Sequence, residues 1–107
     1  MGITLAENVY KTTAKYPKEE VYTLSSQMRR SAISISSNVA EGAARRSSKE
    51  FVRFLYISLG SLSELETQIM IAKKIGYTGN EELIELIELL RSKLLNFIKY
   101  IKNKESA

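Results

Sequence analysis

The 107-residue sequence contains no cysteine, histidine or tryptophan, and it has only one proline and five glycines. The lack of cysteine excludes disulfides, thiolate metal ligands and cysteine nucleophiles. The lack of histidine removes the commonest general base and the commonest zinc ligand. No uncharged run approaches the roughly 20 residues that span a membrane, and no secretory signal is visible. We therefore expect a cytoplasmic protein that is not an enzyme, with no catalytic residue, cofactor, metal or membrane partner.

The length of the chain fits a single domain over residues 1–107. Its 16 basic and 12 acidic residues leave a formal charge of +4. An excess of this size permits contact with nucleic acid without requiring it.

Three breaks divide the chain, at Tyr16-Pro17, at residues 42–48 and at residues 76–80. Between them, apolar side chains recur at spacings of three and four, as in helices that pack by one face. We predict an all-α protein, an antiparallel up-down-up-down four-helix bundle. The four predicted core stripes are Leu5, Val9, Thr12 and Tyr16; Val21, Leu24, Met28, Ala32, Ile35 and Val39; Phe51, Leu55, Ser58, Leu62, Leu65, Ile69 and Ala72; and Leu83, Ile87, Leu90, Leu94, Phe97 and Ile101.

The third and fourth predicted helices also carry apolar residues off these stripes, among them Tyr56, Ile57, Met70, Leu89 and Leu95. A helix that is apolar on two faces is buried on two faces. Because the chain is small, we expect a second copy to cover the second face, which makes the protein a homo-oligomer.

The second predicted helix carries a polar ridge at helical spacing, formed by Gln27, Arg30, Ser34, Asn38, Glu41 and Arg45. It is either a solvated face or a structural network that fixes register. If the turn after this helix centres near Arg45, Glu64 lies level with a residue near 26. The candidate network comprises Gln27, Arg30, Asn38, Glu41 and Glu64. On this geometry Asn38 and Glu41 are too far from Glu64 and need other partners, near Arg53. We expect Glu64 to contact Arg30 or Gln27, within the chain or across a subunit boundary.

Basic residues gather around the second break, and residues 29–53 carry an excess of four positive charges. Arg45, Arg46, Lys49 and Arg53 are candidate nucleic-acid-binding residues, at one end of the bundle and near the free amides of the third helix. A solvated loop whose arginines form internal pairs explains the same pattern.

Several segments together resemble a known family: Leu24-Ser25-Ser26-Gln27-Met28-Arg29-Arg30, Ser37-Asn38-Val39-Ala40-Glu41-Gly42 and Gly60-Ser61-Leu62-Ser63-Glu64-Leu65-Glu66. The sequence is similar to the 23S rRNA intervening-sequence proteins and, more distantly, to the accessory protein of diversity-generating retroelements. The resemblance implies a bacterial, pentameric four-helix bundle with no catalytic residues. It also implies a role with RNA or DNA, through genomic location. The alternative is a protein-interaction scaffold whose basic end docks an acidic partner.

Overall fold

The computed structural model describes residues 1–77 and 79–106, so the expected loop residue Thr78 and the side chain of Val21 lie outside the described residues. The helices are α1 (Gly2–Thr13), a short 3-10 helix η1 (Lys18–Tyr22), α2 (Leu24–Ala43), α3 (Ser48–Ile75) and α4 (Glu81–Ser106). Within the described ranges no residue lies in a strand. The predicted all-α fold with four α-helices is confirmed.

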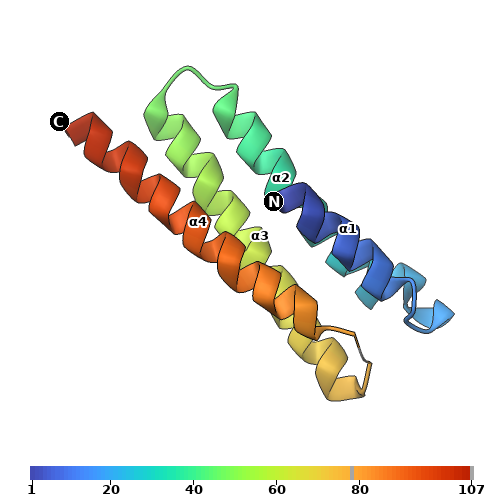
Figure 1. Cartoon of the computed structure of the whole chain (residues 1–107). Coiled ribbons are helices and arrows are strands. Elements are labelled where there is room, and N and C mark those ends of the chain that lie inside the picture. The colour runs from blue at the N-terminus through green and yellow to red at the C-terminus, as the bar shows by residue number, and fades with distance from the viewer. Residues whose placement is uncertain (78, 107) are drawn as a thin grey trace.

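Figure 1 shows α2, α3 and α4 side by side in alternating directions, which is consistent with the expected up-down-up-down order. α1 is much shorter and lies along only the first half of α2. The molecule is a rod of 51 × 22 × 18 Å.

The buried apolar side chains follow the predicted stripes, with one correction in α4. Ile98 is buried there and Phe97 is 39% exposed, whereas the strict alternation of four and three assigned Phe97 to the core. A straight helix has 3.6 residues per turn, so a 3.5-residue pattern drifts off the core face over several turns. Leu24 and Val39 are half-buried against the core.

The chain begins and ends its helices in a different way at each of the three breaks. The hydroxyl of Ser47 accepts a hydrogen bond from the Glu50 amide at 3.0 Å and so caps the start of α3. Gly76 ends α3 with φ of 108°, a left-handed conformation that suits glycine. The helix expected to begin near residue 21 begins at Leu24 instead, because η1 occupies the chain directly after Pro17.

The short α1 divides the rod into two halves. Gly2 lies against Ser36, and Ser58 donates to the carbonyl of Ile35 at 2.9 Å, so these residues mark one level. Residues 1–36, 58–77 and 79–94, where α1 is present, are called the closed half. Residues 37–57 and 95–106, where three helices remain, are called the open half.

Candidate nucleic-acid interface and polar seam

The four predicted nucleic-acid-binding residues lie together at the tip of the open half. Arg45 and Arg46 stand in the turn between α2 and α3, and Lys49 and Arg53 follow on the first two turns of α3. All four are exposed. The helix-turn-helix connection therefore brings them to one end of the rod, which we call the basic end.

Two of these four residues are neutralised by acidic neighbours. Arg45 pairs with Glu41 at 2.6 Å and Arg53 pairs with Glu50 at 3.2 Å. Both guanidinium groups also lie over the ring of Phe54, at 5.1 and 5.6 Å from its centroid. Arg46 and Lys49 make no ion pair with any described residue. The unpaired charge of the predicted set is therefore carried by Arg46 and Lys49.

The last turns of α4 add lysines that the sequence reasoning missed. Lys99, Lys102 and Lys104 are exposed, and Figure 1 shows the C-terminus of α4 near the α2–α3 turn. Antiparallel topology could have found them, because α4 must end where α3 begins.

The basic end thus gathers seven basic and three acidic side chains from three segments: Arg45, Arg46, Lys49, Arg53, Lys99, Lys102 and Lys104 with Glu41, Glu50 and Glu105. This excess of four equals the net charge of the whole chain. Arg29 and Arg30, which the sequence grouped with the same cluster, lie elsewhere. They lie 14 and 13 residues before the end of α2 at Ala43, which is about 20 Å along the helix.

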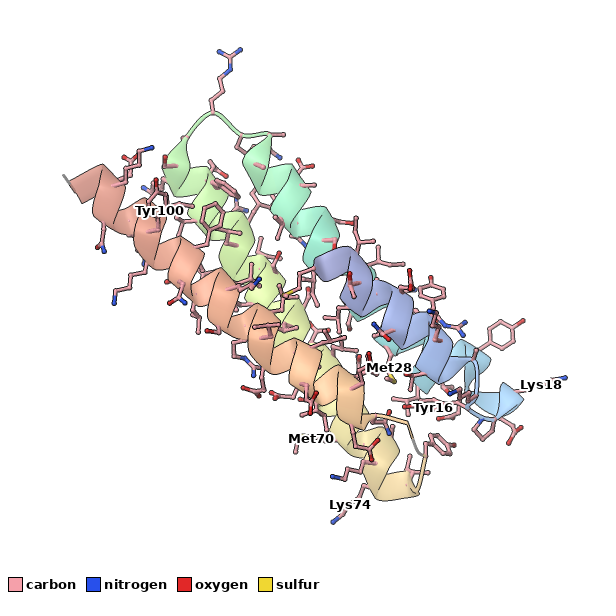
Figure 2. The ribbon with its side chains drawn as sticks, viewed as in Figure 1. Tyr16, Lys18, Met28, Met70, Lys74 and Tyr100 are labelled. Carbon is pink, nitrogen blue, oxygen red and sulfur yellow. The ribbon has the colours of Figure 1, made fainter. Side chains whose placement is uncertain are left out.

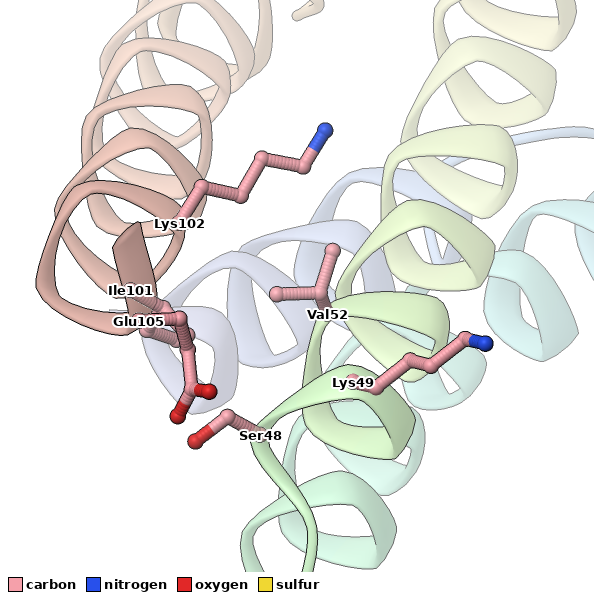
Figure 3. Close-up of a pocket in the computed structure, with 6 residues that line it drawn as sticks. All are labelled: Ser48, Lys49, Val52, Ile101, Lys102 and Glu105. Atoms are coloured by element: carbon pink, nitrogen blue, oxygen red, sulfur yellow. The ribbon is translucent and has the colours of Figure 1, made fainter. Parts of the chain in front are cut away.

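A surface pocket of about 380 Å³ opens at this end between α3 and α4. Figure 3 shows Val52 and Ile101 on its floor, Lys102 reaching from α4 toward α3, and Lys49 pointing away from the pocket. Glu105 and Ser48 stand near each other at its edge. The Lys102 ammonium donates to the hydroxyl of Tyr56 at 3.0 Å. Lys49 and Lys102 line this pocket together with Glu105, and Lys49 is directed away from it, so the pocket alone does not single out an anion.

The polar ridge of α2 becomes a seam of hydroxyl groups against α3. The hydroxyls of Ser34 and Ser61 lie 2.9 Å apart, and Asn38 donates to the carbonyl and the hydroxyl of Ser34. Ser58 donates to the carbonyl of Ile35, and this bond is buried. Of the predicted network, Asn38 is part of this seam, and the serines supply the contacts between the two helices.

The other predicted network residues are not joined within one chain. The side chains of Gln27, Arg30 and Glu64 are exposed and form no ion pair or hydrogen bond with any described residue. The Ser34–Ser61 contact sets Glu64 level with residues 30–31, not near 26, because the turn centres closer to Ser47 than to Arg45. Within the described residues, Glu64 therefore contacts neither Arg30 nor Gln27 through a hydrogen bond or an ion pair. A contact across a subunit boundary stays a prediction.

A second polar cluster, not predicted from sequence, joins the two loops of the closed half. The Tyr16 hydroxyl donates to Oδ1 of Asn80 at 2.5 Å, and Nδ2 of Asn80 donates to the Tyr77 carbonyl at 3.0 Å. The rings of Tyr16 and Tyr77 lie 4.8 Å apart. Burial raises the pKa of the Tyr16 hydroxyl above its ordinary value of 10.0, and the Asn80 hydrogen bond lowers it in part. This cluster fixes α1 to the start of α4.

The described residues hold no group of three acidic side chains placed to share a metal ion. Among the helices described, none is long and apolar enough to cross a bilayer.

The fold and the basic end define a small all-α protein built around three long helices, with a charged tip. Residues 1–99 match the family model described as 23S rRNA-intervening sequence protein. The chain therefore belongs to the 23S rRNA-intervening sequence protein family. No curated protein matches it significantly.

Proposed function

We propose that this chain is a non-enzymatic, homo-oligomeric protein of the cytoplasm that binds nucleic acid through its basic end. The observation that carries the proposal is the convergence of three chain segments that gives this end the whole positive excess of the molecule. Lysine and arginine at a surface bind phosphates by releasing counterions. The family's description refers to an intervening sequence of 23S rRNA, so structured RNA is the first probe.

The test is fluorescence anisotropy with a labelled structured RNA over a salt series. For the wild type, we expect log affinity to fall linearly with log salt concentration. The variant Arg46→Ala/Lys49→Ala removes the two unpaired charges. It is expected to lose affinity and to flatten the slope by about 1.4–1.8, since each of the two lost phosphate contacts contributes about 0.7–0.9.

The matched control is Lys73→Ala/Lys74→Ala, which removes the same charge at the opposite end of the rod. Both lysines are exposed, and Figure 2 shows Lys74 at the end away from Tyr100. A non-specific charge effect would weaken both double variants equally, and that result would contradict a site at the basic end.

Assembly into a homo-oligomer, with the pentamer implied by the resemblance, is supported by the outer face of α3. Tyr56, Met70 and Ile71 are exposed there, and a Cβ added to Gly60 would meet no atom within 4 Å. A glycine inside a helix costs about 1 kcal/mol relative to alanine, and nothing within the chain accounts for it. Close approach of a second copy does.

The assembly is tested by sedimentation velocity on the wild type and Gly60→Leu. We expect the wild type to sediment as a closed oligomer and Gly60→Leu to shift toward the 12.1 kDa chain, with its helical circular dichroism retained. A wild type that remains a monomer at micromolar concentration would refute the assembly.

The alternative function, a scaffold for a protein partner, is favoured by one specific feature. A groove of about 340 Å³ continues the line of α1 between α2 and α4, and it is lined by Ile35, Val39, Ala40, Ala43, Leu90 and Leu94 together with the start of α1. The small side chains of α2 would let a helix approach closely. The substitution Ala40→Glu places a charge in this groove. It is expected to abolish binding of a protein partner and to leave RNA affinity unchanged.

A further inference from the structure

A shallow hollow of about 320 Å³ lies between α1 and α2 in the closed half, away from the basic end. It has the volume of about ten water molecules. Its lining residues are Tyr10, Ser26, Arg29, Arg30 and Ile33. Two positive charges and no acidic side chain therefore line one small depression.

Arg29 is held in a fixed orientation at this hollow. Its Nε donates to Oγ1 of Thr13 at 2.9 Å, and its guanidinium carbon lies 4.9 Å from the ring centroid of Tyr10. The Thr13 hydroxyl in turn donates to the carbonyl of Val9 at 2.7 Å, so it is itself fixed. Both Nη groups of Arg29 remain without a partner among the described residues. A preorganised guanidinium loses less side-chain entropy when it binds a second group.

The other arginines show that this arrangement is unusual in the chain. Arg45, Arg53 and Arg91 each pair with a glutamate. Arg29, Arg30 and Arg46 have no carboxylate partner in the part of the chain that the structure describes. Two of these three arginines are adjacent and share the hollow.

We propose that this hollow binds a phosphate group, with the free guanidinium edges of Arg29 and Arg30 as its main donors and the Ser26 hydroxyl beside them. Arginine forks match the oxygen spacing of phosphate and form charge-assisted hydrogen bonds. The phosphate belongs either to a small phosphate monoester or to a nucleic-acid backbone. The site does not rest on the proposed function, because it lies about 20 Å along α2 from the turn that carries Arg45 and Arg46.

The test is an NMR titration that follows the Arg29 Nε–H signal and the Tyr10 ring. Sodium phosphate and sodium chloride are compared at equal ionic strength. We expect a saturable shift with phosphate only. Arg30→Ala should weaken phosphate binding about tenfold, the equivalent of one charge-assisted contact, with the helical circular dichroism retained because Arg30 is exposed in the chain.

Identical shifts in both salts, or unchanged phosphate affinity in Arg30→Ala, would overturn the proposal. Arg29→Lys keeps the charge but not the fork, and it should weaken binding as well. Lys74→Ala and Arg46→Ala/Lys49→Ala should leave the titration unchanged, so failure of this site is distinguishable from failure of the basic end.

Two further ligands identify the source of the phosphate. Equal affinities for inorganic phosphate and uridine monophosphate indicate a site for small phosphates. An oligonucleotide that binds more than tenfold tighter, and that Arg30→Ala weakens, indicates a backbone contact. Either result supports the site.

Discussion

The closed and open halves of the rod share the same helices but differ in what holds them. In the closed half, α1 completes the bundle, and the described core there includes Leu5, Met28, Leu62 and Leu65, all fully buried. In the open half, the described buried apolar side chains are Leu55, Ile98 and Ile101, while Phe97 and Tyr100 are exposed. The charged tip is therefore carried by the half with the smaller core. Stability and the proposed binding surface are separated along one rod.

Core truncation should show this separation most clearly. Leu65→Ala in the closed half removes a fully buried side chain and is expected to lower the free energy of unfolding by about 3 kcal/mol. Leu95→Ala in the open half truncates a side chain that is 47% exposed and should cost less than about 1 kcal/mol. Urea unfolding measures both. Similar losses would show that the two halves contribute equally.

Although the open half has the smaller core, α2 and α3 approach each other closely there at Gly42. A Cβ at Gly42 would lie 2.7 Å from the Cβ of Phe54 and 2.9 Å from Cδ1 of Phe51. Gly42→Ala is therefore expected to destabilise the fold by about 1–3 kcal/mol. The matched change Gly60→Ala adds the same methyl group where the chain itself has no atom within 4 Å. At a concentration low enough to keep the chain monomeric, it should stabilise by up to about 1 kcal/mol. The sign of the two changes in thermal unfolding checks this contrast.

The cluster of Tyr16, Tyr77 and Asn80 makes the free energy of unfolding of the closed half depend on pH. Burial raises the pKa of Tyr16, so the folded state holds this proton more tightly than the unfolded state does. Its contribution is complete below the unfolded pKa near 10 and is lost as the pH rises through the folded pKa. We expect urea stability to fall above pH 10.

Tyr16→Phe should reduce that loss and cost about 1 kcal/mol at pH 7, because Asn80 loses its donor. Tyr100→Phe, at a side chain that is 59% exposed, serves as the control and should change neither quantity. If Tyr16→Phe keeps the full pH dependence, the effect comes from another group, of which Tyr77 beside Glu20 and Glu19 is the first candidate.

The coupling free energies of ion pairs should show the smallest difference between the closed and the open half. Arg91 of α4 donates to both carboxylate oxygens of Glu66 on α3, at 2.8 and 3.3 Å. A double-mutant cycle on this pair is expected to give a coupling of about 0.5–1 kcal/mol. The exposed pair Arg45–Glu41 should give about 0.3 kcal/mol. Equal couplings would mean that Arg91 and Glu66 do not join the two helices.

The helices and most of the core could be predicted because apolar spacing reports directly on the packed face of a helix. That Ile98 and not Phe97 faces the core of α4 could not be predicted. A strict pattern of four and three residues does not show where a helix of 3.6 residues per turn drifts off the core face. The basic end was half predicted: Arg45, Arg46, Lys49 and Arg53 are close in sequence, whereas the α4 lysines join them only through the fold. The α2 residues level with Glu64 depend on where the α2–α3 turn centres. Placing that centre two residues too early predicted a level near residue 26 instead of residues 30–31.

The hydroxyl seam between α2 and α3 has a consequence for how the chain folds. Ser34–Ser61 and the bond from Ser58 to the Ile35 carbonyl are directional, so sliding one helix by a turn would break both, whereas an aliphatic contact would tolerate the slip. The two helices are joined by only four residues, 44–47, and closing so short a connection costs little chain entropy. We therefore expect this hairpin to form early with its final alignment, and α1 to dock late as the element that completes the tertiary structure.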